Sequence, residues 1–330
     1  MLLLAKAALA LMVSFLTAVV FGFILIPFLK KLKVKQRVSV FLQNKHKGKD
    51  GTPTMGGLIF IIPAIIAIIV LILMNKIEWT DNLFIILFVF LSYALLGFID
   101  DYLIIKRNNN EGLTEIQKLL GQILIAVVFF IIFMKSGRSP VLDIHTLGIK
   151  IDLGWFYGLF ILFVLVASSN AVNLTDGLDG LAGGLSTIAF IAFGIISFGS
   201  TWISGNQDIG IFCFILVGAL LGFLVYNTHP AKVFMGDTGS LALGATLASV
   251  AILTSHEVTL IVVAGVFVFE TVCSLIQMIA GRYFNKKVFL MAPFHHHLEK
   301  LGWQETDIVK LFWIIGMVLG MTGIYFGVWL

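Results

Sequence analysis

Five aspartates in this 330-residue chain stand in short polar segments that interrupt an otherwise apolar sequence. They are Asp100, Asp101, Asp176, Asp179 and Asp237. Acidic side chains at a membrane boundary are costly unless they are paired, bind a metal ion or line a water-filled cleft. Carboxylates without thiolates suit a hard cation such as Mg²⁺, which proteins hold through one or two carboxylates together with substrate phosphates. The pattern therefore predicts magnesium-assisted chemistry on a phosphorylated substrate.

The segment NLTDGLDGLAGG, residues 173–184, follows an apolar run and repeats polar residues at a spacing of three. Asn173, Asp176 and Asp179 share one face if the segment is helical, and its glycines allow a close approach of the backbone. Such a surface suits a sugar or a diphosphate lying on the backbone. The alternative is a helix end capped by Asp, with the glycines packed against a neighbouring helix.

Two further segments indicate phosphate binding. GDTGS at 236–240 begins a predicted helix, whose free amides and positive dipole end favour phosphate, and Asp237 is placed to hold the metal ion. Consecutive His295, His296 and His297 diverge on a helix, so hydrogen bonds to phosphate fit better than one shared metal ion. The simpler alternatives are that Asp237 caps its helix and that the histidines are solvated.

Two other polar groups leave their roles open. Asp100 and Asp101 point about 100° apart on a helix, so we expect two different functions, with a solvated helix end as the alternative. Glu270, Ser274 and Gln277 share one face of a predicted span. That face either forms interhelical hydrogen bonds or lines the cleft.

The elements that must position these residues are membrane-spanning helices. Of all residues 59% are hydrophobic and only 12% are charged, which is outside the range of soluble domains. A spanning helix needs roughly 20 mostly apolar residues. We therefore expect an all-α polytopic membrane protein, one domain over 1–330, with ten transmembrane helices and a short outer β-hairpin near 140–153. The expected spans are approximately 3–29, 55–74, 82–103, 117–134, 154–172, 180–200, 209–227, 239–254, 258–281 and 308–329.

The distribution of basic residues predicts the orientation of the chain. Ten spans give two sets of loops, and one set carries 17 of the 22 lysines and arginines. The positive-inside rule makes this set cytoplasmic, which leaves both termini extracytoplasmic. Every polar segment described above then lies on the cytoplasmic face, where five loops distant in sequence form one cleft.

Five segments, in this order, resemble the motifs of the polyprenyl-phosphate N-acetylhexosamine-1-phosphate transferases. They are GTPTMGG at 51–57, DDY at 100–102, NLTDGLDGLAGG at 173–184, PAKVFMGDTGSL from Pro230, and PFHHHLE at 293–299. The likeness covers nearly the whole chain. The first and last segments favour the muramoyl-pentapeptide branch of this family over the branch that uses N-acetylglucosamine phosphate.

The resemblance implies a reaction and its partners. The reaction is transfer of phospho-N-acetylmuramoyl-pentapeptide from UDP-N-acetylmuramoyl-pentapeptide to undecaprenyl phosphate, giving lipid I and UMP with Mg²⁺ at the cytoplasmic face of a bacterial plasma membrane. A homodimer in the lipid bilayer is expected, without nucleic acid. No Walker A motif, kinase signature or nucleophilic Ser or Cys constellation is present in the sequence. A sister-branch enzyme remains an alternative, as does a nucleotide-sugar transporter, which should place charges near the bilayer midplane.

The resemblance also implies roles for individual residues. Asp100, Asp101, Asp237 and His296 are the expected catalytic residues, with Asp237 as the Mg²⁺ ligand and Asp176 as a second candidate ligand. The expected substrate-binding residues are Lys49, Thr54, Lys118, Asn173, Asp176, Asp179, Asn227, Phe234, His295 and His297. Among these, Asp179 and Phe234 would hold uridine. One residue departs from the family pattern: Ile104 stands where a lysine is usual, and Lys106 and Arg107, which follow closely, are the candidates to replace it. A single displacement by the lipid phosphate is expected, with an aspartyl intermediate as the alternative.

Overall fold

The computed structural model of the chain describes residues 2–31, 51–107, 112–144, 147–199 and 205–328, and these residues are predominantly helical. The helices are α1 (Leu2–Lys31), α2 (Leu58–Leu73), α3 (Asp81–Arg107), α4 (Glu115–Lys135), α5 (Phe156–Thr175), α6 (Leu181–Gly199), α7 (Gln207–Asn227), α8 (Gly236–Leu253), α9 (Glu257–Val263), α10 (Gly265–Phe284), α11 (Phe294–Lys300) and α12 (Glu305–Val328). The strands are β1 (Val141–Ile144) and β2 (Ile149–Asp152).

Eight of the described helices are long and apolar enough to cross a membrane. They are α1, α3, α4, α5, α6, α7, α10 and α12. Helices α2 and α8 are also apolar but are shorter than these eight. At 1.5 Å per residue, the 16 residues of α2 extend about 24 Å, against a hydrocarbon core of about 30 Å. A multi-pass helical fold is thus confirmed, whereas the number of ten spans stays a prediction.

Helix α8 lies at the centre of the bundle, which explains how a short helix can serve there. Every residue from Thr238 to Leu253 is buried, and α8 packs against α3, α5 and α6. Small residues allow this close packing: a Cβ at Gly97 of α3 would lie 2.1 Å from the Asp237 carbonyl oxygen. A helix surrounded by protein need not match the thickness of the bilayer.

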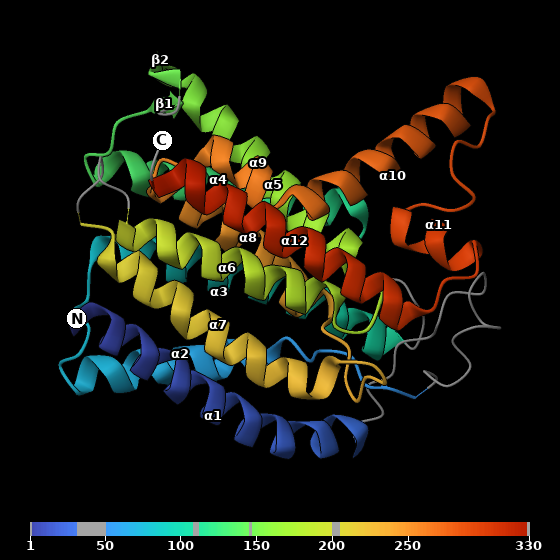
Figure 1. Cartoon of the computed structure of the whole chain (residues 1–330), viewed down its shortest axis with the longest axis horizontal. Helices are drawn as coiled ribbons and strands as arrows, with labels where there is room; N and C mark the ends of the chain where they lie inside the picture. The colour runs from blue at the N-terminus through green and yellow to red at the C-terminus, as the bar shows by residue number, and fades with distance from the viewer. Residues whose placement is uncertain (1, 32–50, 108–111, 145–146, 200–204, 329–330) are drawn as a thin grey trace.

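The ninth predicted span, 258–281, is not one straight helix. It divides at Ala264 into α9 and α10. Ala264 caps both helices: its N–H donates to the Leu260 carbonyl of α9 at 2.8 Å, and its carbonyl accepts from Val268 N–H of α10 at 3.0 Å. Glycine at 265 has low helix propensity, which favours a bend at this point. Helix α10 then leaves the bundle at an angle (Figure 1).

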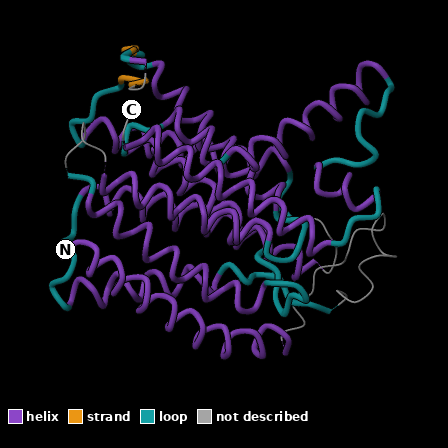
Figure 2. Tube along the Cα trace, in the orientation of Figure 1, coloured by secondary structure: helices purple, strands orange, loops and turns teal. Residues whose placement is uncertain are grey.

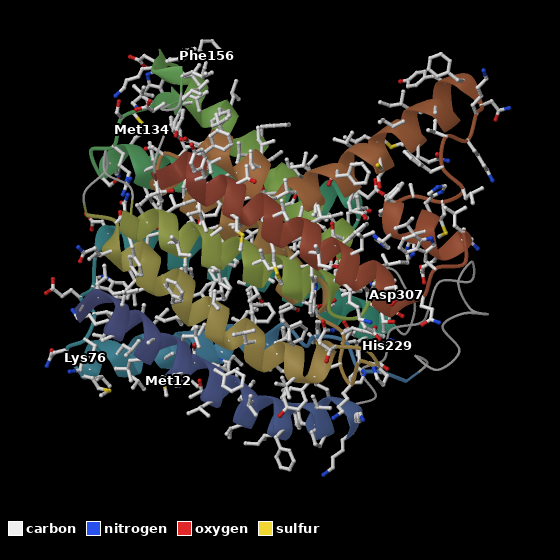
Figure 3. All side chains as sticks on the ribbon, in the orientation of Figure 1. Met12, Lys76, Met134, Phe156, His229 and Asp307 are labelled. Atoms are coloured by element: carbon white, nitrogen blue, oxygen red, sulfur yellow. The ribbon has the colours of Figure 1, made fainter. Side chains whose placement is uncertain are left out.

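The connections between helices collect at the two ends of the bundle. Figure 1 shows the described ends of the chain at one end, while α11 and the α7–α8 connection lie at the other. Figure 2 shows several loops crowded together at that second end, and Figure 3 places His229 and Asp307 there and Lys76 and Phe156 at the opposite end. We call the end with His229 the loop end and the other the hairpin end. Which of them faces the cytoplasm stays a prediction.

The predicted hairpin near 140–153 is confirmed. Strands β1 and β2 pair antiparallel, with Val141 opposite Asp152 and Ile144 opposite Ile149. Beside it, at the hairpin end, the Tyr157 hydroxyl donates to Glu257. The Arg138 guanidinium donates to Asn82 and to the Leu253 carbonyl. Burial raises the pKa of Glu257 to about 7 and lowers the pKa of Arg138 from its usual value. This polar cluster ties the starts of α3, α5 and α9 together.

Candidate active site

The first turn of α8 is held from outside by a carboxylate on α3. Asp101 accepts hydrogen bonds from Asp237 N–H at 3.2 Å, Thr238 N–H at 3.0 Å and the Thr238 hydroxyl at 2.6 Å. Its side chain is buried, with 4% exposed. Orphan amides at a helix start need such acceptors. Asp101 therefore fixes where α8 begins and, with it, where Asp237 points.

The carboxylates of Asp237 and Asp100 face one ammonium group. Lys118 of α4 donates from Nζ to Oδ2 of Asp237, and the same Nζ lies 3.4 Å from Oδ2 of Asp100. Asn173 Nδ2 donates to Oδ1 of Asp237 at 2.7 Å, and Leu113 N–H donates to Asp100 at 2.8 Å. We call this group, Asp100, Lys118, Asn173 and Asp237, the acidic centre. The different environments of Asp100 and Asp101 fit the expectation of two functions.

The positive charge of Lys118 matters because a lysine that is usual in the family is missing from α3. The usual lysine of α3 is replaced by Ile104. The capping box of Thr114 and Gln117 starts α4 at Glu115. This start places Lys118 in the first turn of α4, beside the acidic centre. Lys118 is thus one cation at the acidic centre, and the consequence of Ile104 stays open.

The GTPTMGG segment lies against the residues that lead into α8. Phe234 N–H donates to the Pro53 carbonyl at 2.8 Å, and Gly56 N–H donates back to the Phe234 carbonyl at 2.8 Å. The hydroxyl of Thr54 is buried and has no hydrogen-bond partner among the residues described. A Cβ at Gly236 would lie 2.7 Å from Thr54 Oγ1. Thr54 therefore stands beside the start of α8.

These residues fit the chemistry of a Mg²⁺ site. The acidic centre offers hard oxygen donors and already surrounds a positive charge, that of Lys118. The orphaned Thr54 hydroxyl provides one more oxygen close to the first turn of α8. Mg²⁺ prefers such oxygen ligands and shares them with phosphates. Asp176, the second candidate ligand, is the C-cap residue that follows the last residue of α5, Thr175.

A second polar cluster includes two residues that the sequence analysis did not single out, His229 and Glu305. His229 Nδ1 lies 3.0 Å from Oδ2 of Asp179 and 3.5 Å from Oε2 of Glu305. Asp179 N–H donates to Glu305 at 2.7 Å, and Ala231 N–H donates to Oδ2 of Asp179 at 3.1 Å. The polar segment NTHPAKV, residues 227–233, could have marked His229 as a candidate site residue. For Glu305 the sequence offered only its place at the start of a helix. We call Asp179, His229 and Glu305 the His229 cluster.

The donor atoms of the His229 cluster are close enough together to hold a metal ion. The 3.0 Å between Nδ1 and Oδ2 of Asp179, however, is the distance of a hydrogen bond, and Oε2 of Glu305 at 3.5 Å is an electrostatic neighbour of the same nitrogen. Asn227 lies next to this cluster and holds backbone on both sides. It accepts from Gly180 N–H at 3.1 Å and donates to the Val233 carbonyl at 3.0 Å.

The three histidines of α11 face three different environments. His295 is fully buried, with no exposed side-chain surface to offer a substrate. His296 Nδ1 lies 2.6 Å from Oε2 of Glu299 and the ring is 12% exposed. His297 Nδ1 accepts from Leu290 N–H at 3.1 Å. The three rings have different polar partners, but those of His295 and His296 contact each other edge-on, with centroids 4.1 Å apart. Of these two neighbours, only His296 is partly exposed, which fits a contact with substrate.

The structure therefore brings most of the expected site residues to the loop end, in three groups. Asp100, Asp237, Lys118 and Asn173 form the acidic centre, with Asp101 and Thr54 beside it. Asp179 belongs to the His229 cluster, flanked by Asn227. The histidines stand on α11, and Phe234 is half-buried in the α7–α8 connection. Lys49 lies outside the described residues. The roles expected for these residues stay predictions.

Comparisons with known proteins agree on one family. Residues 83–255 match the model of glycosyl transferase family 4. Residues 49–61 match phospho-N-acetylmuramoyl-pentapeptide-transferase signature 1. The phospho-N-acetylmuramoyl-pentapeptide-transferase of Geobacillus thermodenitrificans is 47% identical over 97% of this chain and 98% of its own length. The transferase of the same name from Bacillus subtilis is 46% identical over 97% of both chains.

Proposed function

Because the chain belongs to the phospho-N-acetylmuramoyl-pentapeptide transferases, enzymes of glycosyl transferase family 4, we propose that it makes lipid I. In this reaction an oxygen of undecaprenyl phosphate attacks the β-phosphorus of UDP-N-acetylmuramoyl-pentapeptide. The bond from that phosphorus to the oxygen bridging it to the α-phosphorus breaks, and UMP leaves. The observation that carries the proposal is the acidic centre, where two carboxylates and a lysine meet at the start of α8.

The centre supports this chemistry through charge and position. The positive end of the α8 dipole lies at this centre, although Asp101 already accepts hydrogen bonds from the amides of Asp237 and Thr238. Lys118 supplies a positive charge for the transferring phosphoryl group. The acceptor is a phosphate monoester with a second pKa near 6, so it is mostly dianionic at neutral pH. A strong base is therefore dispensable, and Asp100 serves to orient the attacking oxygen.

Mg²⁺ is the cofactor we propose, with Asp237 as its ligand and Asp176 as a second candidate. When bound, it neutralises charge on the phosphates. Asn173 holds Oδ1 of Asp237 at 2.7 Å, and Asp101 holds the backbone on which Asp237 is carried. These two contacts set the direction of the Asp237 side chain before substrate arrives.

Donor recognition is proposed for the residues around the centre. Asp179 and Phe234 bind uridine, and His296 hydrogen-bonds the sugar-phosphate part of the donor. Lys49 and Thr54 contact phosphates. The loop end is then the cytoplasmic face, where a nucleotide sugar is available, and the acceptor enters from the bilayer. A homodimer is the proposed assembly.

The test is release of UMP by the purified protein with undecaprenyl phosphate and Mg²⁺. Two donors are compared, UDP-N-acetylmuramoyl-pentapeptide and UDP-N-acetylglucosamine. We expect turnover with the first alone, and a fall of at least 100-fold in Asp237→Asn. Asp307→Asn is the matched control, because this carboxylate lies at the same end of the bundle (Figure 3) and its side chain is 55% exposed. It should retain activity.

Other outcomes would change the proposal in defined ways. Turnover of UDP-N-acetylglucosamine would assign the chain to the sister branch. No turnover with either donor would contradict the proposed reaction and favour the alternative of a nucleotide-sugar transporter. A radiolabelled sugar-phosphate trapped on the protein without acceptor would replace the single displacement by an aspartyl intermediate.

A further inference from the structure

Helix α10 carries one fully buried carboxylate on a helix that is otherwise largely exposed. Only Val266, Phe267, Glu270 and Cys273 of its 20 residues are buried, and Phe269, Val272 and Leu275 are among its exposed apolar side chains. Glu270, in contrast, has no exposed surface. A buried carboxylate requires compensating partners, so the groups around it indicate what it does.

The partners of Glu270 are the first residues of the histidine helix. Phe294 N–H donates to Oε2 at 2.7 Å and His295 N–H donates to Oε1 at 3.1 Å. Nδ1 of His295 lies 3.2 Å from Oε2. The Phe269 ring packs edge-on against the Phe294 ring, with centroids 5.0 Å apart. One carboxylate thus collects two amides and faces one imidazole at the start of α11.

The same face of α10 holds the chain that leads to α11. Gln277, two turns further along, accepts from Val288 N–H at 3.1 Å and Phe289 N–H at 2.9 Å. Ser274 lies between them, and its hydroxyl donates within the helix to the Glu270 carbonyl. The polar face of α10 therefore accepts hydrogen bonds from the backbone of a loop. The sequence pattern had suggested either hydrogen bonds between helices or the lining of a cleft.

On its far side, α11 is pressed against the acidic segment that follows α5. A Cβ at Gly177 would lie 2.3 Å from Nε2 of His295. His295 therefore fills the space between Glu270 and Gly177, while the next residue, His296, is turned toward Glu299 and remains partly exposed. The place of His296 relative to Asn173 and Asp176 depends on how firmly α11 is seated.

We propose that Glu270 is a positioning residue for the transfer reaction, which sets the location of His296 by fixing the start of α11. The proposal rests on the donor contact assigned to His296 in the proposed function. A carboxylate suits the task because both of its oxygens accept hydrogen bonds. An amide in its place would turn an NH₂ group toward one of the two backbone donors. Glu270 itself touches no reacting atom in this scheme.

The experiment uses the full-length protein in detergent and compares Glu270→Gln with Ser274→Ala. Ser274 is the matched control, since it lies one turn away on the same face. Hydrogen exchange followed by mass spectrometry reports on the amides of residues 290–300. Steady-state kinetics give KM for each substrate separately. We expect Glu270→Gln to raise exchange in this segment at least tenfold and leave α12 unchanged. The donor KM should rise at least fivefold while the acceptor KM stays within twofold. Ser274→Ala should behave as wild type.

A donor-specific change in KM separates positioning from a general loss of folded protein, which would lower the rate and leave both KM values intact. Unchanged exchange in 290–300 would overturn the proposal, as would raised exchange with an unchanged donor KM. Fast exchange of the Phe294 and His295 amides in the wild-type protein would also overturn it, even if the variant failed to fold. Exchange does not depend on turnover, so a failure of the proposed reaction would be recognised separately by the absence of wild-type activity.

Discussion

Gly177 lies directly against the imidazole of His295, so closely that a Cβ at position 177 would be 2.3 Å from Nε2. Real Cβ atoms do not approach other heavy atoms to this distance, so an alanine here would force His295 to move. His295 is fully buried and beside Glu270, which leaves it little room. Two segments more than 100 residues apart are thus matched in shape, the glycine in one accommodating the histidine in the other.

Replacing Gly177 by alanine should therefore lower kcat/KM at least tenfold, because the displaced imidazole would shift α11 and His296. His295→Ala removes the clashing ring, so the double variant should recover activity relative to Gly177→Ala alone. A double-mutant cycle on UMP release measures this coupling. Simple additivity of the two losses would show that the contact does not control the site. Gly281→Ala is the control, since a Cβ at this glycine meets no described atom within 4 Å.

Glu299 orients the ring of His296, with Oε2 only 2.6 Å from Nδ1. Residues that fix the direction of a functional imidazole typically contribute about 10- to 100-fold where they have been removed from metal sites. We expect Glu299→Ala to lower kcat/KM for the donor by about this factor. Glu299→Gln should lose less, since it keeps one acceptor oxygen for Nδ1. Lys300→Ala, the exposed neighbour, should be silent. Equal losses in the Ala and Gln variants would show that the negative charge, rather than the hydrogen bond, is needed.

The fold was predictable where hydropathy and turn chemistry are local signals. The hairpin near 140–153 and the long apolar helices follow from such patterns, because lipid leaves few alternatives to a helix. The division at Ala264 was not predicted, since the apolar run continues through it and only Gly265 marks the place. The central position of α8 could not be predicted either. It depends on how α3, α5 and α6 pack around this helix, which is a tertiary property.

The site was predictable in its members and less so in its contacts. The spacing of Asn173, Asp176 and Asp179 marked the polar segment, but Asn173 turns to Asp237 whereas Asp179 turns to His229. Sequence spacing predicts a shared face only within a helix, and α5 ends at Thr175, before Asp176 and Asp179. The partners of Glu270 could not be anticipated either, because they are backbone amides of a segment 24 residues later, and amides leave no trace in the sequence.

His229 should influence donor affinity through Asp179. Its Nδ1 lies 3.0 Å from Oδ2 of Asp179 and 3.5 Å from Oε2 of Glu305 on α12. Without the ring, Asp179 is held less firmly, so His229→Ala should raise the donor KM roughly fivefold, equivalent to about 1 kcal/mol, with kcat nearly unchanged. Glu305→Gln should also raise the donor KM, and the double variant should raise it by less than the product of the two single effects.

Inhibition by UMP, measured in the same preparations, should weaken in parallel. A fall in kcat with normal donor KM would contradict a role in binding. Loss of tightly bound metal in His229→Ala, measured by mass spectrometry, would show that the His229 cluster is a metal site.

Glu257 should make the stability of the protein depend on pH. Burial raises its pKa from about 4.5 to about 7 in the folded state, so the folded protein holds a proton that the unfolded chain releases. Where the folded state binds more protons, stability falls as pH rises. The loss should therefore accumulate between about pH 4.5 and 7 and be complete above it, with a size of roughly 3 kcal/mol.

Glu257→Gln mimics the protonated acid and still accepts from the Tyr157 hydroxyl, so this variant should lack that part of the pH dependence. The measurement is the midpoint of thermal unfolding in detergent at pH values from 5 to 8, read as the difference between variant and wild type. This difference should increase in favour of the variant as pH rises. Glu78→Gln is the matched control, because Glu78 is an exposed acid between α2 and α3. A difference that stays constant across this range would mean that Glu257 is ionised in the folded protein.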